Sequence, residues 1–176
     1  MGSPDNLLIR LPQKQEDYVR ELFAQLAEEG FPQQNQRPHI TITFAPEMDP
    51  KVVDRAHQLL PEVIPAQFQR VGTVVFGTKS KQTIAWLLET DAELGKAARE
   101  LSEVNPEGRG LWWIPHLTMG LRIPRAQVPG YIEALDRLTS GHFRSMTGEV
   151  AGLWQPRKQI WTPVAPVADS IGAQTN

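Results

Sequence analysis

The stretches RPHITITF (residues 37–44) and IPHLTMGL (residues 114–121) share one pattern: proline, histidine, an apolar residue, threonine and another apolar residue. Alternation of this kind is typical of a β-strand, in which positions i and i+2 point to the same face. His39 and His116 therefore each have a threonine hydroxyl beside them, while the residue in between points to the core. With 15 prolines and four histidines in the chain, a shuffled sequence would give such a matched pair roughly once in several thousand trials.

Around the first motif, hydrophobic periodicity and turn residues predict a strand, a helix, the motif strand, a second helix and a hairpin. Asp49 is expected to cap the second helix, and Pro50 to occupy its first turn. The expected elements are a strand at 6–11, a helix ending at Gly30, a strand that His39 opens, a helix from Pro50, and strands at 66–76 and 83–89.

The same order of elements is expected again around the second motif. The two histidines are 77 positions apart (116 − 39), and expected strand centres near Leu7, Ile84 and Trp161 have the same spacing. We therefore predict two pseudo-repeats, about 6–82 and 83–164, in one bilobal domain at 1–166, followed by a flexible tail at 167–176. The expected elements of the second repeat are a helix capped by Asp91, a loop at 105–115, a strand that His116 opens, a helix around 131–138, and strands around 143–154 and 159–164.

Composition narrows the classes of function. A net charge of −2 gives no strong overall attraction to long nucleic acids, so a nucleic-acid substrate is expected to be small or gripped at its end. The absence of cysteine excludes disulfides, thiol catalysis and cysteine-based zinc sites. No apolar run has the length of a membrane span and no signal-peptide pattern opens the chain, so we expect a cytoplasmic protein.

Several catalytic classes lack their sequence signals. No His-Glu-x-x-His motif is present and no acidic residue lies within two positions of His39 or His116, so we expect no metal. A Gly-x-Ser-x-Gly elbow and a Gly-rich phosphate loop are also missing, which argues against a serine hydrolase and an ATP-driven ligase. The expected enzyme uses no cofactor.

The residues of the two motifs suit chemistry at a phosphodiester. Such a reaction needs a base for the attacking oxygen, an acid for the leaving oxygen and donors for the non-bridging oxygens. His39 and His116 are the candidate catalytic residues, and Thr41 and Thr118 the candidate phosphate-binding residues.

The paired His-x-Thr motifs resemble those of the two-histidine phosphoesterases, and the bacterial RNA 2′,3′-cyclic phosphodiesterase or 2′-5′ RNA ligase-like branch is the most similar. The resemblance spans nearly the whole chain. It implies an α+β fold of the LigT-like type, duplicated and bilobal, with antiparallel sheets lining a central cleft and helices outside. It also implies that one histidine activates the nucleophile and the other protonates the leaving oxygen, without assigning which does which.

The resemblance favours a phosphodiesterase that acts on RNA ends or small nucleotides and opens 2′,3′-cyclic phosphates. An ATP-independent 2′-5′ RNA ligase and a non-catalytic module that binds nucleotides or RNA ends stay open as alternatives. We expect a monomer that binds an RNA end or a small nucleotide, with no membrane and no obligatory protein partner. The motifs differ at one position, where the first has Thr43 and the second Gly120.

Residues near the two motifs are further candidates for contact with the substrate. Arg37, Trp112, Trp113 and Arg122 lie near the motifs and are candidates for the substrate rim. A tryptophan of the Trp112-Trp113 pair would stack on a base, or both would pack beneath the loop. Two aromatic residues are expected in the core, and two further histidines are expected on the surface without a role: Phe44 and Trp154, and His57 and His142.

Overall fold

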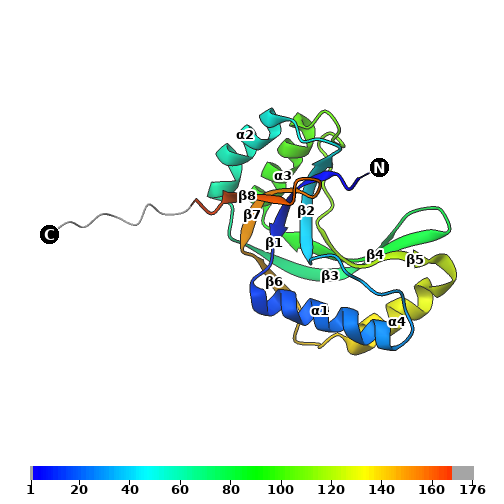
Figure 1. The fold of residues 1–176 in the computed structure, drawn as a ribbon. Helices are drawn as coiled ribbons and strands as arrows, with labels where there is room; N and C mark the ends of the chain where they lie inside the picture. Colours follow the sequence, from blue (N-terminus) through cyan, green and yellow to red (C-terminus); the bar gives the residue numbers. More distant parts are fainter. Residues whose placement is uncertain (1, 168–176) are drawn as a thin grey trace.

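Residues 2–167 are described by the computed structural model of the protein, and within them four α-helices accompany an eight-stranded antiparallel sheet (Figure 1). This confirms the predicted α+β class. Of the tail expected at 167–176, only Val167 belongs to this range, and 168–176 lie outside the described residues. The elements up to the middle of the chain are β1 (Asp5–Arg10), α1 (Gln13–Glu28), β2 (His39–Ala45), α2 (Pro50–Leu59), the 3-10 turn η1 (Leu60–Glu62) and β3 (Ala66–Phe76).

The remaining elements follow the order strand, helix, strand, helix, strand that also opens the chain. Both motif strands begin at their histidines, as predicted. The strand segments expected around 143–154 are two strands, which are separated at Glu149. These elements are β4 (Lys81–Thr90), α3 (Ala92–Val104), β5 (His116–Pro124), the 3-10 turn η2 (Arg125–Gln127), α4 (Val128–Leu138), β6 (Ser145–Gly148), β7 (Val150–Gln155) and β8 (Ile160–Ala165).

All eight strands belong to one sheet, in the order β6-β3-β4-β5-β2-β1-β7-β8. The family resemblance implied more than one sheet, whereas the structure joins all eight strands into one sheet at the middle of this order. There β2 and β5 are joined by a single registered pair, Ile40 opposite Leu117. The sheet therefore continues across this junction through one registered residue pair.

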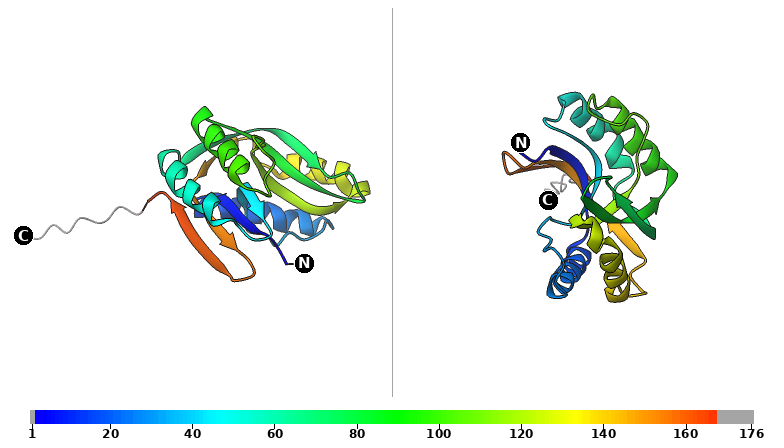
Figure 2. Two further views of the ribbon diagram at one scale, coloured as in Figure 1. Left: turned by 90° about the horizontal axis from the view of Figure 1, so that it is seen from above. Right: turned by 90° about the vertical axis from the view of Figure 1, so that its right-hand side faces the viewer.

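The helices form two pairs, α1 with α4 and α2 with α3. In the view of Figure 1 one pair lies above the strands and the other below them, and the right-hand view of Figure 2 shows the same separation. One apolar core, which includes the fully buried Trp86 and Phe68, extends from the strands to both pairs. No helix between residues 2 and 167 combines the length and apolar character needed to cross a membrane.

The predicted helix caps are present. The Asp49 side chain accepts from the backbone N–H of Lys51 at 2.9 Å, and Pro50 is the first residue of α2. The Asp91 side chain accepts from the backbone N–H of Leu94 at 2.8 Å and caps the N-terminus of α3. These short-range signals place α2 and α3 directly after β2 and β4.

An irregularity in β2 overturns the prediction that Phe44 lies in the core. Leu7 pairs with Thr43 and Leu8 with Thr41, which leaves Ile42 as an extra residue opposite β1. Such a bulge switches the following side chains to the other face. Thr43 is therefore buried, and Phe44 is 52% exposed.

Two other expectations about packing are corrected or resolved. Trp154 is only half-buried and lines a cavity instead of the core. Gly120 leaves room for a neighbour, because a Cβ at this position would lie 2.8 Å from the Tyr131 ring. The Tyr131 hydroxyl donates to the Met119 carbonyl. Thr43 and Gly120 therefore differ because each fits its own surroundings: Thr43 is buried on β2, and Gly120 leaves space for the Tyr131 ring.

Candidate active site

The single pair between β2 and β5 determines which motif side chains face one another. Ile40 and Leu117 are opposite each other and completely buried. In an antiparallel ladder, the residues on either side of such a pair point to the opposite face and lie across from each other. The motif residues on that opposite face are all half-buried: His39 across from Thr118, and Thr41 across from His116.

Both histidine rings are held by the backbone in the same way. Nδ1 of His39 lies 2.6 Å from the Arg37 carbonyl oxygen, and Nδ1 of His116 lies 2.7 Å from the Ile114 carbonyl oxygen. Because a carbonyl only accepts, each Nδ1 is assigned the proton. The Nε2 atom of each neutral ring then keeps its lone pair for proton transfer.

Burial is the main cause that lowers the pKa of His39 below its usual value of 6.5, and the positive charges of His116 and Arg10 lower it further. Burial also lowers the pKa of His116. The hydrogen bonds to backbone carbonyls act in the opposite direction at both rings. The net effect favours the neutral form of each imidazole.

Asn6 on β1 contacts both residues of the first motif. Its Nδ2 donates to Thr41 Oγ1 at 3.1 Å and lies 3.4 Å from His39 Nε2. Asn6 was not among the residues predicted for the site, although a signal existed. In the apolar strand NLLIRL, Asn6 and Arg10 are the polar positions of one face, and that face is the one His39 and Thr41 share.

A cavity of about 90 Å³ lies on the His116 side of the four motif residues. The rings of Phe76 and His116 are 4.8 Å apart between centroids. Trp112 is 70% exposed at the edge of this cavity, and Phe44 is the other strongly exposed aromatic residue there. An aromatic rim therefore adjoins His116.

Two side chains of the loop between α3 and β5 form hydrogen bonds to β2, and both are buried or half-buried. Trp113 Nε1 donates to the Thr41 carbonyl at 2.9 Å. Asn105 Nδ2 donates to Thr43 Oγ1 at 2.8 Å and to the Phe44 carbonyl at 3.1 Å. Trp113 thus packs beneath the loop, whereas its neighbour Trp112 points outward.

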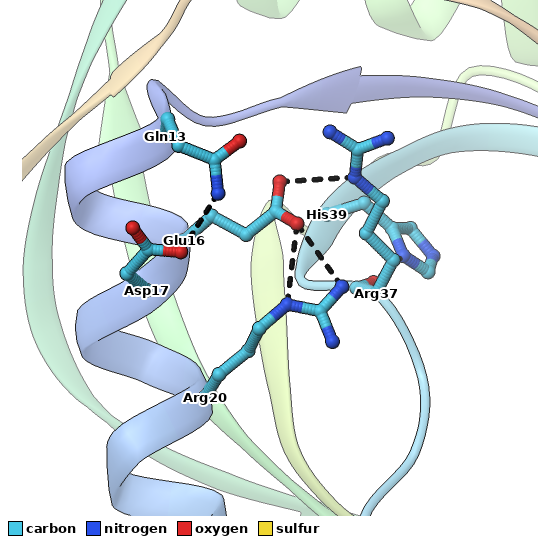
Figure 3. Close-up of polar contacts among 6 residues, drawn as sticks. All are labelled: Gln13, Glu16, Asp17, Arg20, Arg37 and His39. Carbon is cyan, nitrogen blue, oxygen red and sulfur yellow. Dashed lines mark hydrogen bonds and ion pairs between the residues drawn. The ribbon is translucent and has the colours of Figure 1, made fainter.

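A larger cavity of about 630 Å³ lies on the His39 side. Arg37, a predicted rim residue, lines it and forms an ion pair with Glu16 of α1 at 2.9 Å (Figure 3). Arg122 is exposed on β5 and is absent from the lining of both cavities. Two further lining residues, Arg10 and Trp161, were not predicted from the sequence.

The remaining polar candidates stand apart from this site. His57 and His142 are exposed, as predicted. Across the part of the chain that the structure covers, no group of three or more histidine, aspartate or glutamate side chains is placed to hold a metal ion.

Comparison with known proteins finds a family model that matches part of the chain. The model of the family described as LigT like Phosphoesterase matches residues 9–86, which include the first motif and end within β4. This match confirms the resemblance to the two-histidine phosphoesterases, which are enzymes that act on phosphodiester bonds. No curated protein matches the chain.

Proposed function

We propose that the protein is a metal-independent phosphodiesterase that opens 2′,3′-cyclic phosphates on RNA ends or small nucleotides. One observation supports this most strongly: His39, Thr41, His116 and Thr118 share one face of the sheet at the β2–β5 junction. With each Nδ1 bound to a carbonyl, the Nε2 atom of each ring is left to face a phosphate bound over this face of the sheet. The family match over residues 9–86 supports action on a phosphodiester.

The reaction needs one neutral and one protonated imidazole. The neutral ring takes a proton from water as the water oxygen bonds to phosphorus. The protonated ring gives its proton to the ribose oxygen as the bond between that oxygen and phosphorus breaks. The product is a 2′- or 3′-phosphomonoester, and proton exchange with solvent restores the starting state. Hydroxyls of Thr41 and Thr118 donate to the non-bridging oxygens.

The surroundings of the two rings favour His39 as the base. The amide nitrogen of Asn6 lies near its Nε2, which suits a lone pair there, and Arg10 disfavours a second positive charge. In the state with one proton shared between the two rings, the proton then belongs to His116. His116 is therefore the acid in this direction of the reaction.

The aromatic rim next to His116 is a suitable binding position for the nucleobase of the substrate. Bases of single-stranded RNA stack on exposed aromatic side chains, at about 1–3 kcal/mol per base. Trp112 is the most exposed aromatic residue beside the cavity, and Phe44 is also exposed there. We therefore propose that the nucleobase of the substrate stacks on this rim.

The test is a turnover assay after treatment with a chelator, on the four nucleoside 2′,3′-cyclic phosphates and on a short RNA ending in a cyclic phosphate. Wild type should hydrolyse at least one of them. His39→Ala and His116→Ala should each lose about 10²–10⁴-fold in rate, while the exposed control His142→Ala keeps wild-type activity. A wild-type protein that needs added metal, or motif variants that keep full activity, would refute the proposal.

The same samples separate the two alternatives. An ATP-independent 2′-5′ ligase uses these residues in reverse, so it would join a 5′-hydroxyl end to the cyclic phosphate end and yield a 2′-5′ bond. A binding module would retain affinity for the cyclic phosphates and show no turnover in either direction.

A further inference from the structure

The cavity on the His39 side contains an arginine held in an unusual way. The Arg10 guanidinium carbon lies 3.5 Å from the centroid of the Trp161 ring. Arg10 is the registered partner of His39 across β1 and β2, so this guanidinium begins at the residue next to the proposed base. Trp161 lies on β8, at the edge of the sheet.

Stacking on a ring occupies the face of a guanidinium and leaves the N–H groups at its edge free. Within residues 2–167, the Arg10 side chain forms no ion pair and no hydrogen bond. Burial is the largest cause that lowers the pKa of Arg10, to about 10, and the charge of Arg37 adds to it. Arg10 is thus still a cation at neutral pH and has free donors.

The backbone of β7 is shaped to admit the Trp161 ring. A Cβ at Gly152 would lie 2.6 Å from Cζ2 and 2.7 Å from Cη2 of Trp161. Only glycine lets the indole lie this close over the strand. Gly152 therefore allows Trp161 to reach Arg10 across β7.

A second arginine, Arg37, lines the same cavity and is held in position by an ion pair with Glu16. Glu16 is 3% exposed on α1, and its carboxylate receives the Nε–H of Arg37 at 2.9 Å and the Nη2–H of Arg20 at 3.0 Å (Figure 3). Only the Nε of Arg37 is used in this contact, so its terminal nitrogens stay available. Glu16 thus pairs with Arg20 and Arg37, while Arg10 adds a further positive charge to the same region without an ion pair of its own among the described residues, so the cluster has an excess of positive charge.

We propose that the cavity between Arg10, Arg37 and Trp161 binds a second phosphate group of the substrate, in addition to the phosphate that reacts between His39 and His116. Arginine forks match phosphate oxygens, and about 630 Å³ is ample for a nucleotide phosphate and its sugar. The inference rests on the proposed function and narrows its substrate to nucleotides with at least two phosphate groups. The second phosphate belongs to a 5′-phosphorylated nucleotide or to an internucleotide link.

Three substrates test the proposal: adenosine 2′,3′-cyclic phosphate, its 5′-phosphorylated form, and the dinucleotide ApA with a terminal cyclic phosphate. Wild type should show kcat/KM about tenfold or more higher for a substrate with the second phosphate. The 5′-phosphorylated nucleotide and the dinucleotide separate the two sources. Arg10→Gln and Arg37→Gln should lose this preference, mainly through KM, whereas Arg99→Gln on the exposed face of α3 retains it.

Trp161 is a positioning residue in this account. Trp161→Leu leaves both arginines in the chain but removes the ring on which Arg10 lies. It should therefore lose part of the preference for the second phosphate. Full preference in Trp161→Leu would overturn the positioning role.

Binding of unreactive ligands distinguishes failure of this proposal from failure of the proposed function. Calorimetry should give a Kd about tenfold or more lower for adenosine 3′,5′-bisphosphate than for adenosine 3′-phosphate, and Arg10→Gln should equalise the two. Equal affinities in wild type would overturn the second-phosphate site, whatever the turnover. A clear preference without turnover of any cyclic phosphate would support the site and refute the phosphodiesterase.

Discussion

Replacing Thr43 by valine removes a hydroxyl from the first motif strand and keeps the β-branched shape. Thr43 Oγ1 accepts from Asn105 Nδ2 at 2.8 Å, and both residues are buried. The valine would leave one N–H of the Asn105 amide without a partner, at a cost of about 1–3 kcal/mol, while the amide still donates to the Phe44 carbonyl. In a chain of this size each kcal/mol lowers Tm by about 2–4 °C, so Tm should fall by about 2–12 °C.

The matched substitution Thr41→Val removes the other hydroxyl of the strand and should act on the rate. Loss of a donor to a developing oxyanion typically costs about 10²–10³-fold in kcat. Thermal unfolding gives Tm, and turnover is compared at a temperature where every variant is folded. In an Asn105→Ala background, Thr43→Val should cost little more stability, because its partner is already gone. The reasoning fails if Thr43→Val keeps the wild-type Tm, or slows folded enzyme as much as Thr41→Val does.

Three further predictions concern stability and the loop. Since burial lowers the pKa of His39 and of His116 below 6.5 in the folded state, the unfolded chain binds more protons, and stability should fall as the pH drops below about 6.5. Unfolding measured from pH 5 to 8 should show a shallower acid loss when both are glutamine; identical slopes would count against these pKa shifts. Gly120→Ala should cost about 1–3 kcal/mol, seen as a lower Tm, because its Cβ would meet a buried tyrosine ring; an unchanged Tm would show that the ring moves aside. Trp113→Phe should lose about 0.5–1.5 kcal/mol of stability with its hydrogen bond, whereas Trp112→Ala, on the exposed neighbour, should keep Tm and raise KM; the reverse pattern would exchange their roles.

Local signals in the sequence predicted the parts of the fold that depend on neighbouring residues. Alternation located both motif strands, and aspartates located the starts of α2 and α3. The error at Phe44 came from the same rule, because a bulge at Ile42 depends on pairing with β1 and has no local signal.

The same distinction between local and long-range signals applies to the residues of the candidate site. The two His-x-Thr motifs were found because their residues are close in sequence. Arg10 and Trp161 lie at opposite ends of the chain and meet only through the pairing of β1, β7 and β8. Asn6 and Arg10 did leave a trace, as polar residues on one face of an apolar strand.

The central claim is that His39 and His116 act together on one phosphate, and the rates of the two single alanine variants and of the double variant test it most directly. Groups that act as a unit in one transition state are strongly non-additive. With a 2′,3′-cyclic phosphate substrate, the double variant should therefore be within about tenfold of the slower single variant. Losses that multiply, or one histidine whose removal leaves the rate unchanged, would contradict the account.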